Sequence, residues 1–208
     1  MKNKINSIFP TLIAQGSLPK SEALNRRMMK DILIISKEDK MGRQWSKESY
    51  RGGYTSYGSL SDLHSRYPSF AAFELALQPH AEAFAKAQGW NLKGLELRMT
   101  QLWVNVMPAN VYHTLHFHPH SALSGGYYVQ TPPNSIPMKI EDPRMALYMN
   151  APLRENTTAA SKDLYYKVPA KAGEFVIFES WLRHEVPPNT SKKPRVSLSF
   201  NYSLDNEE

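Results

Sequence analysis

The chain has no cysteine among its 208 residues. This absence excludes disulfide bonds, cysteine nucleophiles and metal sites built from thiolates. It also fits a cytoplasmic protein, because disulfides are rare in that compartment, and a cytoplasmic location is what we expect. Any chemistry that the chain performs must therefore use other side chains.

Long apolar runs are missing as well. No stretch approaches the roughly 18 apolar residues that a membrane-spanning helix needs. Residues 1–15 have basic ends but neither a long apolar core nor a small-residue cleavage site, so they do not fit a secretory signal. The chain also lacks low-complexity runs and repeats of fixed period. With 41% apolar and 21% charged residues, its composition is that of a soluble globular protein without membrane association.

Charge of one sign is in moderate excess. The formal net charge is +6, and the Lys and Arg residues are spread along the chain instead of forming a cluster. A solvated basic surface is the interpretation that we favour, and nucleic-acid binding is kept as an alternative.

The length suits one domain over residues 1–208. Within it, residues 1–93 are predicted to hold a first strand, helices and a long loop, and residues 94–204 a β-sheet core.

In the N-terminal part, apolar residues at spacings of three and four predict helices over residues 21–35 and 67–87, and Gly89 is expected to end the second helix. Residues 5–15 are predicted to form the first strand. Residues 36–60 are polar and contain several glycines, so we predict a long loop there, either a lid over a site or a simple connection.

Beyond residue 94 the apolar pattern changes to the alternation of β-strands. About eight short strands at these spacings predict an antiparallel sandwich or barrel, that is, a mainly β (α+β) jelly roll of two sheets. Residues 145–161 are predicted to be irregular. The expected strands cover residues 95–106, 113–119, 121–130, 138–141, 163–168, 174–178, 184–186 and 194–204.

Four of the seven histidines fall between His113 and His120. In an extended strand, alternate side chains share a face, so His116 and His118 are expected to point the same way and His113 the other way. Pro119 is expected to bend the chain, which favours the pair 116/118 over the pair 118/120. Two imidazoles at this spacing can bind one metal ion.

A third metal ligand must come from elsewhere, and His184 is the candidate, 66 residues after His118 (184 − 118 = 66). Eleven residues further on, Arg195 and Ser197 share one face of the last predicted strand. A planar, permanently charged guanidinium is well suited to bind a carboxylate, and the Ser197 hydroxyl can add a hydrogen bond.

Residues Trp103 to Tyr202, about half of the chain, resemble a family of 2-oxoglutarate/Fe(II)-dependent oxygenases of bacteria and phages. The matching motifs are His116-x-His118-Pro, Leu123-Ser-Gly-Gly-Tyr-Tyr-Val129, Glu141-Asp-Pro-Arg144, Gly173-Glu-Phe-Val-Ile-Phe178, Ser180-Trp-Leu-Arg-His184 and Arg195-Val-Ser-Leu-Ser-Phe-Asn201. The resemblance implies a double-stranded β-helix with the two N-terminal helices packed outside. It also implies an oxidoreductase that hydroxylates a substrate with O₂, Fe(II) and 2-oxoglutarate.

The resemblance also implies roles for individual residues. His116, His118 and His184 would hold the metal, while Arg195 and Ser197 would hold the far carboxylate of 2-oxoglutarate. Apart from the resemblance, three further polar strand residues are candidates for the pocket lining: Asn105 and Tyr128, which we expect to bind the cosubstrate, and Asn201.

Position 118 departs from most such oxygenases, which have a carboxylate there. Fe(II), dianionic 2-oxoglutarate and one carboxylate sum to a single negative charge, whereas a neutral His118 makes the sum zero. Asp142 or Glu185 could supply a carboxylate from elsewhere.

Two other functions stay open. One is a cupin-like enzyme that binds Zn or Fe through three histidines and does not use 2-oxoglutarate. The other is a non-catalytic module that binds a metal and meets nucleic acid or a protein. The prime substrate, a small molecule or a protein, is not identified by the sequence, and a homodimer is possible.

Overall fold

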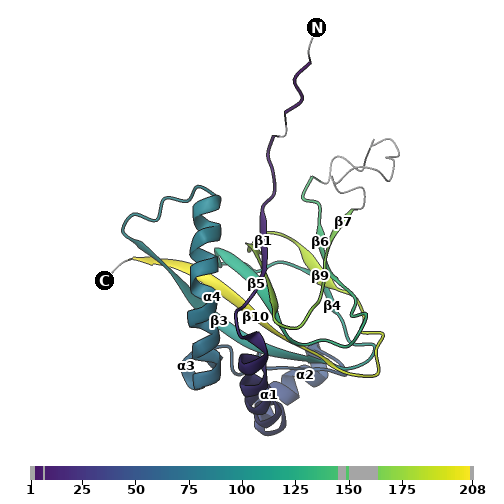
Figure 1. Ribbon diagram of the computed structural model, residues 1–208. Coiled ribbons are helices and arrows are strands. Elements are labelled where there is room, and N and C mark those ends of the chain that lie inside the picture. Colours follow the sequence, from purple (N-terminus) through teal and green to yellow (C-terminus); the bar gives the residue numbers. More distant parts are fainter. Residues whose placement is uncertain (1–2, 7, 145–148, 150–163, 207–208) are drawn as a thin grey trace.

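The computed structural model describes residues 3–6, 8–144, 149 and 164–206. Its centre is a pair of facing antiparallel β-sheets, with helices against the outer face of the larger sheet (Figure 1). This arrangement confirms the predicted α+β jelly roll with N-terminal helices outside. The predicted irregular segment 145–161 lies almost entirely outside the described residues.

The larger sheet has six strands in the order β1-β8-β5-β10-β3-β2. Strands β3 and β10 pair along nearly their whole length, and β5 and β10 are the two middle strands. The strands are β1 (Ile13–Ser17), β2 (Tyr54–Thr55), β3 (Leu95–Met107), β5 (Leu123–Gln130), β8 (Glu174–Glu179) and β10 (Arg195–Asn206).

The smaller sheet has four strands in the order β4-β9-β6-β7. These are β4 (His113–His116), β6 (Met138–Glu141), β7 (Tyr165–Val168) and β9 (His184–Val186). It faces the side of the larger sheet that the helices leave uncovered, and a small apolar cluster that includes Ile140 and Phe178 fills part of the space between the sheets.

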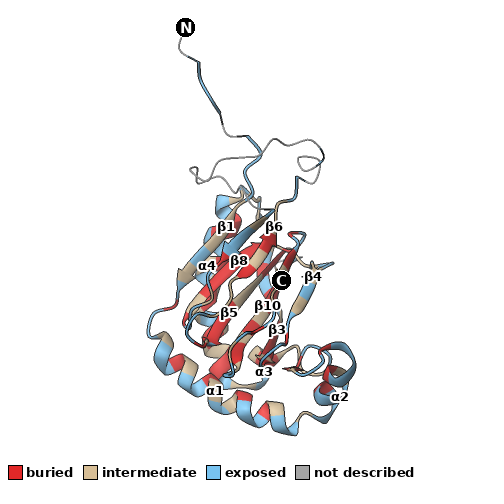
Figure 2. Ribbon diagram, turned by 90° about the vertical axis from the view of Figure 1, so that its right-hand side faces the viewer, coloured by how far each residue is buried: buried red, intermediate tan, exposed pale blue. Residues whose placement is uncertain are grey.

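The described residues before β3 contain four helices: α1 (Ser21–Glu38), α2 (Lys40–Ser49), α3 (Leu63–Arg66) and α4 (Pro68–Ala87). Helix α4 buries Phe70, Phe73 and Leu77, at spacings of three and four. These side chains join the main apolar core with residues of β3, β5 and β10. Figure 2 shows buried residues concentrated on the strands of the larger sheet and on the inner sides of the helices. Both predicted helices are confirmed.

Strand β10 separates the helix side of the larger sheet from the side that faces the smaller sheet. Its even-numbered residues from Val196 to Tyr202 belong to the main apolar core. Its odd-numbered residues from Arg195 to Asn201 line a cavity between the sheets. Because side chains alternate along this strand as predicted, its polar residues from Arg195 to Asn201 all lie on the face that lines the cavity.

Two N-terminal predictions are wrong. The strand predicted at 5–15 begins only at Ile13, and the preceding arm extends away from the body (Figure 1). Ile5 and Phe9 on this arm are 96% and 87% exposed. Apolar composition favoured a strand there, but a strand also needs a neighbouring strand for its backbone hydrogen bonds.

The segment 36–60 is not one long loop, because it contains α2 and β2. Asp39 caps α2 by accepting the Gly42 N–H at 2.8 Å. The Ser46 hydroxyl accepts the Thr55 N–H at 3.0 Å and so ties the helix to β2. Hydrogen bonds from polar side chains, and not a regular stripe of apolar residues, hold this segment in place. The sequence therefore lacks the apolar periodicity that predicts a helix or strand, and it suggested a loop.

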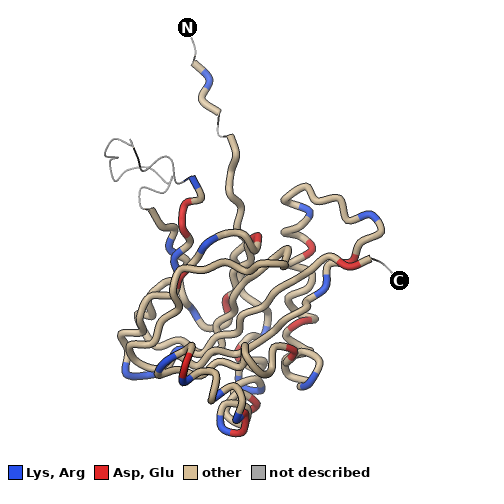
Figure 3. Tube along the Cα trace, turned by 180° about the vertical axis from the view of Figure 1, so that it is seen from behind, with Lys and Arg blue, Asp and Glu red and all other residues tan. Residues whose placement is uncertain are grey.

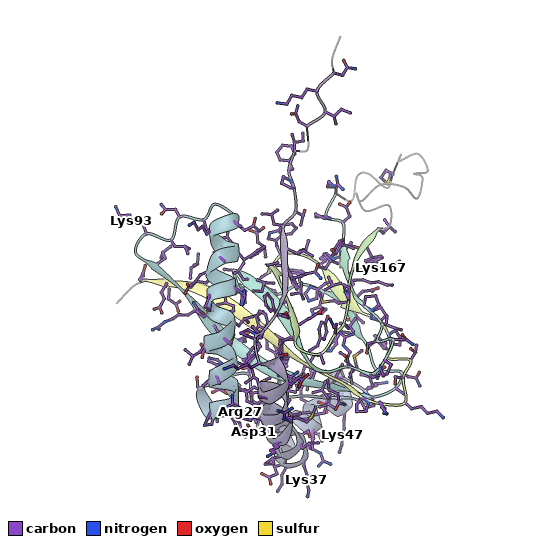
Figure 4. All side chains as sticks on the ribbon, viewed as in Figure 1. Arg27, Asp31, Lys37, Lys47, Lys93 and Lys167 are labelled. Carbon is purple, nitrogen blue, oxygen red and sulfur yellow. The ribbon has the colours of Figure 1, made fainter. Side chains whose placement is uncertain are left out.

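The charged side chains are dispersed over the molecule. Lys and Arg (blue) and Asp and Glu (red) are both scattered along the described part of the trace, without a region of one sign (Figure 3). Lys37, Lys93 and Lys167 project from three different regions (Figure 4). In the described part of the chain, no helix is both long enough and apolar enough to cross a bilayer.

Candidate metal and cosubstrate site

Two strands of the smaller sheet bring the histidines together. His116 ends β4 and lies directly opposite His184, which begins β9. His118 follows just after β4, and its backbone N–H donates to the Ser180 carbonyl at 3.0 Å. Strand pairing therefore places two of the imidazoles, and a backbone hydrogen bond to the β8–β9 connection holds the third nearby.

The three rings converge. One ring nitrogen from each of His116, His118 and His184 lies within 4.8 Å of the other two. The Nδ1 atoms of His116 and His184 lie 2.6 and 2.9 Å from the carbonyl oxygens of Thr114 and Leu182. A carbonyl only accepts, so each Nδ1 carries a proton and donates it, which leaves the Nε2 lone pair free for a ligand bond.

This donor set fits a divalent transition metal. Nitrogen ligands lie about 2.0–2.1 Å from such an ion, so two neighbouring ligand nitrogens are expected about 3.0–3.4 Å apart. Nε2 of His118 and Nε2 of His184 are 3.3 Å apart. Imidazole suits Fe(II), Zn, Cu and Ni, so the geometry admits Fe(II) without selecting it.

Burial keeps these imidazoles neutral. Burial, with a smaller contribution from the nearby His116, lowers the pKa of His118 to about 4 and that of His184 to about 3. The pKa of His116 is also lowered, mainly by burial. A metal ligand must be unprotonated, so the folded chain presents the histidines in the binding form near neutral pH.

The carboxylates considered for the site lie elsewhere. Asp142 is bonded to Arg144 at 2.6 Å, and Glu185 accepts from Lys139 at 3.0 Å. Among the described residues, the group that can hold a metal contains histidines only. His120 is not part of that group, in line with the preference for the pair 116/118.

A β-bulge changes the direction of His113. The strand register pairs His113 with Val186 and His116 with His184, so three steps along β4 match two along β9. The extra residue turns His113 toward the side of His116, where it lines the same cavity. The expectation that His113 faces away is therefore wrong, because simple alternation assumes a strand without a bulge.

The residues predicted for the cosubstrate form a row across the larger sheet. Ser197 on β10 pairs with Asn105 on β3 and with Tyr128 on β5. Arg195 lies two residues before Ser197 and shares its face. All four line the cavity into which the three histidines project, so residues far apart in the chain meet in one place.

Arg195 is the charged member of this row and is only 4% exposed. Its Nη1 donates to the Ile136 carbonyl at 2.9 Å, and its guanidinium carbon lies 4.8 Å from the centroid of the Tyr128 ring. Its Nε has no hydrogen-bond partner among the described residues. A buried cation with an unpaired donor beside a cavity is suited to an anionic ligand.

Asn201 lies further along the same face of β10. Its Oδ1 accepts from the Ser124 hydroxyl at 2.7 Å, and its Nδ2 donates to Gln101 at 2.6 Å. Because both ends of the amide are satisfied inside the protein, Asn201 is better suited to hold the wall of the cavity than to bind a ligand. Asn105 differs, since its Oδ1 is buried and has no partner among the described residues.

The cavity has a volume of about 710 Å³. One wall carries aromatic rings: Trp103 lies 5.8 Å from His118, Tyr57 lies 5.1 Å from Trp103, and Trp45 lies 5.8 Å from Tyr57, measured between ring centroids. Among the described lining residues, Arg195 is the only side chain with a permanent charge. The space beside the histidines therefore suits an uncharged molecule with a flat or apolar surface.

Several lining residues were not predicted from the sequence. Trp45, Tyr50, Thr55 and Tyr57 all come from the segment 36–60. A signal was present, because aromatic side chains recur in this otherwise polar stretch. Counting these aromatic side chains would have favoured a segment that covers a site over a simple connection, two alternatives that the sequence left open.

Comparisons with known proteins agree with this geometry. Residues 101–201 match a family model described as "Putative 2OG-Fe(II) oxygenase". The matched residues include the three converging histidines and Arg195. They also include Asn105 and Tyr128, the strand partners of Ser197. No curated protein matches the chain.

Solved structures share the fold. A prolyl-4-hydroxylase of Pseudomonas putida has a TM-score of 0.61 and 15% identity, covering 93% of this chain and 92% of that one. The α-ketoglutarate-dependent epimerase SnoN of nogalamycin biosynthesis has a TM-score of 0.63 and 16% identity, over 95% and 79%. The collagen prolyl hydroxylase of Paramecium bursaria Chlorella virus-1 has a TM-score of 0.55 and 9% identity, over 91% and 94%. At these identities the likeness establishes the double-stranded β-helix alone.

Proposed function

We propose that this chain is a 2OG-Fe(II) oxygenase, the family whose model matches residues 101–201, and that it hydroxylates a C–H bond of an uncharged substrate. When bound, Fe(II) and 2-oxoglutarate would together reduce O₂, releasing succinate and CO₂ and placing one oxygen atom in the substrate. The observation that carries the proposal is the meeting of three converging imidazoles and a buried, incompletely paired guanidinium in a single cavity.

The histidines would hold the metal through Nε2. His116 and His184 are kept in the required tautomer by the backbone carbonyls that their Nδ1–H groups contact. With His118 neutral, the ligand set carries no negative charge. A dianionic cosubstrate therefore meets no carboxylate repulsion at this site, which favours its binding.

Arg195 would bind the far carboxylate of 2-oxoglutarate, with Ser197 as a second donor on the same strand face. The guanidinium lies in a buried setting, so its attraction for a carboxylate is screened less than it would be at the surface. Tyr128 supports the guanidinium from one side. These contacts fix one end of the cosubstrate and direct the other end toward the histidines.

The substrate would lie against the aromatic wall made by Trp103 and Tyr57. Rings of this kind bind flat or apolar surfaces and exclude water from the reacting atoms. Since the described lining offers no acidic side chain, a cationic substrate would find no counter-charge there. We therefore expect an uncharged substrate.

The first experiment measures conversion of 2-oxoglutarate to succinate by the Fe(II)-loaded protein without any prime substrate. We expect slow succinate formation that is lost in Arg195→Gln. The matched control is Arg183→Gln, because Arg183 pairs with Glu141 at the surface and lies outside the cavity. Absence of succinate from wild-type protein with a full complement of iron would refute the proposal. Incorporation of ¹⁸O from ¹⁸O₂ into the product of the prime substrate, and not only into succinate, would then distinguish hydroxylation from epimerisation.

A second candidate is a three-histidine metal enzyme that does not use 2-oxoglutarate. The observation in its favour is the absence of a carboxylate from the described metal-binding group. In that case Arg195→Gln would leave metal-dependent activity nearly unchanged, and calorimetry would detect no binding of 2-oxoglutarate to the wild-type protein.

A further inference from the structure

Tyr50 is a buried phenol that the roles assigned so far do not use. It is the residue after α2, only 5% exposed, and it lines the cavity. Its hydroxyl has no hydrogen-bond partner among the described residues. A buried hydroxyl without a partner lowers stability, so a ligand that supplies the missing acceptor would remove this cost.

The partner that Tyr50 lacks is an acceptor. Burial raises the pKa of the Tyr50 phenol well above its ordinary value, and the nearby Arg195 charge lowers it by less. The phenol therefore stays protonated and can donate. Arg195 Nε is a second unpaired buried donor lining the same cavity. Two donors without acceptors, one of them on a cation, together favour an anionic oxygen ligand.

The position of the Tyr50 ring is well determined by its neighbours. It stacks on the His113 ring with centroids 4.5 Å apart and planes 24° apart. On another side it contacts Gly53, where an added Cβ would lie 2.5 Å from Tyr50 Cε1. Only a glycine leaves room for the ring there. The β-bulge that turns His113 into the cavity thus also provides the surface on which Tyr50 rests.

We propose that the Tyr50 hydroxyl donates a hydrogen bond to the far carboxylate of 2-oxoglutarate beside Arg195, and that His113 is the positioning residue that holds the Tyr50 ring. This inference rests on the proposed function. It adds to the binding site a residue from outside the family match at 101–201, contributed by the segment that follows α2.

The test measures dissociation constants by calorimetry on the Mn(II)-loaded full-length protein, with two ligands. One is 2-oxoglutarate, and the other is 2-oxopentanoate, in which a methyl group replaces the far carboxylate. Tyr50→Phe should weaken 2-oxoglutarate binding by about 10-fold or more, as expected for a hydrogen bond to a charged group. It should change 2-oxopentanoate binding by less than about twofold, since that ligand lacks the acceptor.

Tyr202→Phe is the matched control. It also removes a buried hydroxyl without a partner among the described residues, but Tyr202 lies in the apolar core and does not line the cavity. This variant should leave both dissociation constants unchanged. A loss of 2-oxoglutarate affinity in Tyr202→Phe equal to that in Tyr50→Phe would mean a general effect on the fold and would overturn the inference.

The role of His113 is tested by two substitutions. His113→Phe keeps a ring against Tyr50 and should preserve 2-oxoglutarate affinity, whereas His113→Ala removes the stacking partner and should weaken it. Thermal unfolding of the metal-free variants shows whether each one is folded. Equal affinity in His113→Ala and wild type would remove His113 from the proposal.

The outcomes separate this inference from the proposed function. If the wild-type protein does not bind 2-oxoglutarate, the proposed function fails and the inference fails with it. If the wild type binds 2-oxoglutarate and Tyr50→Phe binds it equally well, only the inference fails. Equal losses for both ligands would place the contact of Tyr50 away from the far carboxylate, and this too would overturn the inference.

Discussion

At the scale of single residues, the site depends on histidines whose charge is controlled by burial. Burial lowers the pKa of His113 and His184 to about 3 and that of His118 to about 4, against 6.5 ordinarily. Neutral imidazoles can bind a metal at neutral pH, but they make the folded state sensitive to acid.

The first prediction concerns the pH dependence of stability. Between pH 4 and 6.5 these histidines are protonated in the unfolded chain and neutral in the folded one, so unfolding takes up protons. The free energy of unfolding of the metal-free protein should therefore fall as pH decreases through this window, by up to about 1.4 kcal/mol per pH unit for each such group. Urea denaturation at several pH values measures it, and a flat profile would contradict the burial of these rings.

The second prediction concerns metal binding. His184→Ala should weaken the binding of Mn(II) or Fe(II) by more than the about 10–100-fold that loss of a supporting contact to a ligand costs. His120→Asn is the control, because His120 lies outside the converging group and has a φ of 64°, which asparagine tolerates. Metal titration of both variants measures the effect. Equal affinities would show that the convergence is not a metal site.

At the scale of elements, the segment 36–60 is anchored through Asp39. Its carboxylate accepts the Gly42 N–H at the start of α2 and the Tyr54 hydroxyl on β2, each at 2.8 Å. It also accepts the Ser59 hydroxyl. The Asp39 side chain thus links the start of α2 to β2 and to Ser59. Tyr50 and Tyr57, which line the cavity, both lie between these linked points in the chain.

The third prediction follows from this anchor. Asp39→Ala removes a helix cap, which costs about 0.5–2 kcal/mol, and it also leaves the Tyr54 and Ser59 hydroxyls without their acceptor. We expect lower stability together with weaker 2-oxoglutarate binding, because Tyr50 is no longer held in place. Denaturation and calorimetry measure both quantities. Glu48→Ala, which removes only an exposed contact with Gln44, should change neither, and unaltered affinity in Asp39→Ala would argue against a fixed segment.

Elements also show where prediction from sequence succeeded. The strand at β10 and its polar face were predicted, because alternation over many residues is a strong signal. The bulge at β4 was not predicted, since it arises from pairing with β9 and leaves no mark in the pattern of His113 to His118. The pair His116 and His118 was predicted from the alternation of side chains along one strand. In the structure the strand ends at His116, and a backbone hydrogen bond to Ser180 holds His118 near the other two histidines.

At the scale of the whole molecule, helices α1 and α4 and the cavity use opposite faces of the larger sheet. Phe73 on α4 is fully buried against residues of this sheet, with its ring centroid 4.9 Å from that of Tyr127. The apolar layer on the helix side therefore supports the strands whose other face carries Arg195 and Ser197.

The fourth prediction tests this layer. Phe73→Ala should lower the free energy of unfolding by about 3–5 kcal/mol, the usual cost of removing a large ring from a core. Leu75→Ala on the same helix is 75% exposed and should change stability by less than about 0.5 kcal/mol. Chemical denaturation of both variants provides the comparison. Similar small losses in both would mean that α4 is not bound to the sheet as described.

The sequence by itself determined the strands beyond residue 94, the helices α1 and α4 and the candidate residues of the site, because these depend on local periodicity and on side-chain chemistry. It also predicted that His184 and Arg195 belong with the histidine cluster. Only the tertiary structure decided that His113 turns inward, that no described carboxylate joins the three histidines, and that the segment 36–60 supplies Tyr50 and Tyr57. The physical reason is that these features arise from strand register and packing between distant segments, where the partner of a residue cannot be identified from its own neighbours in the chain.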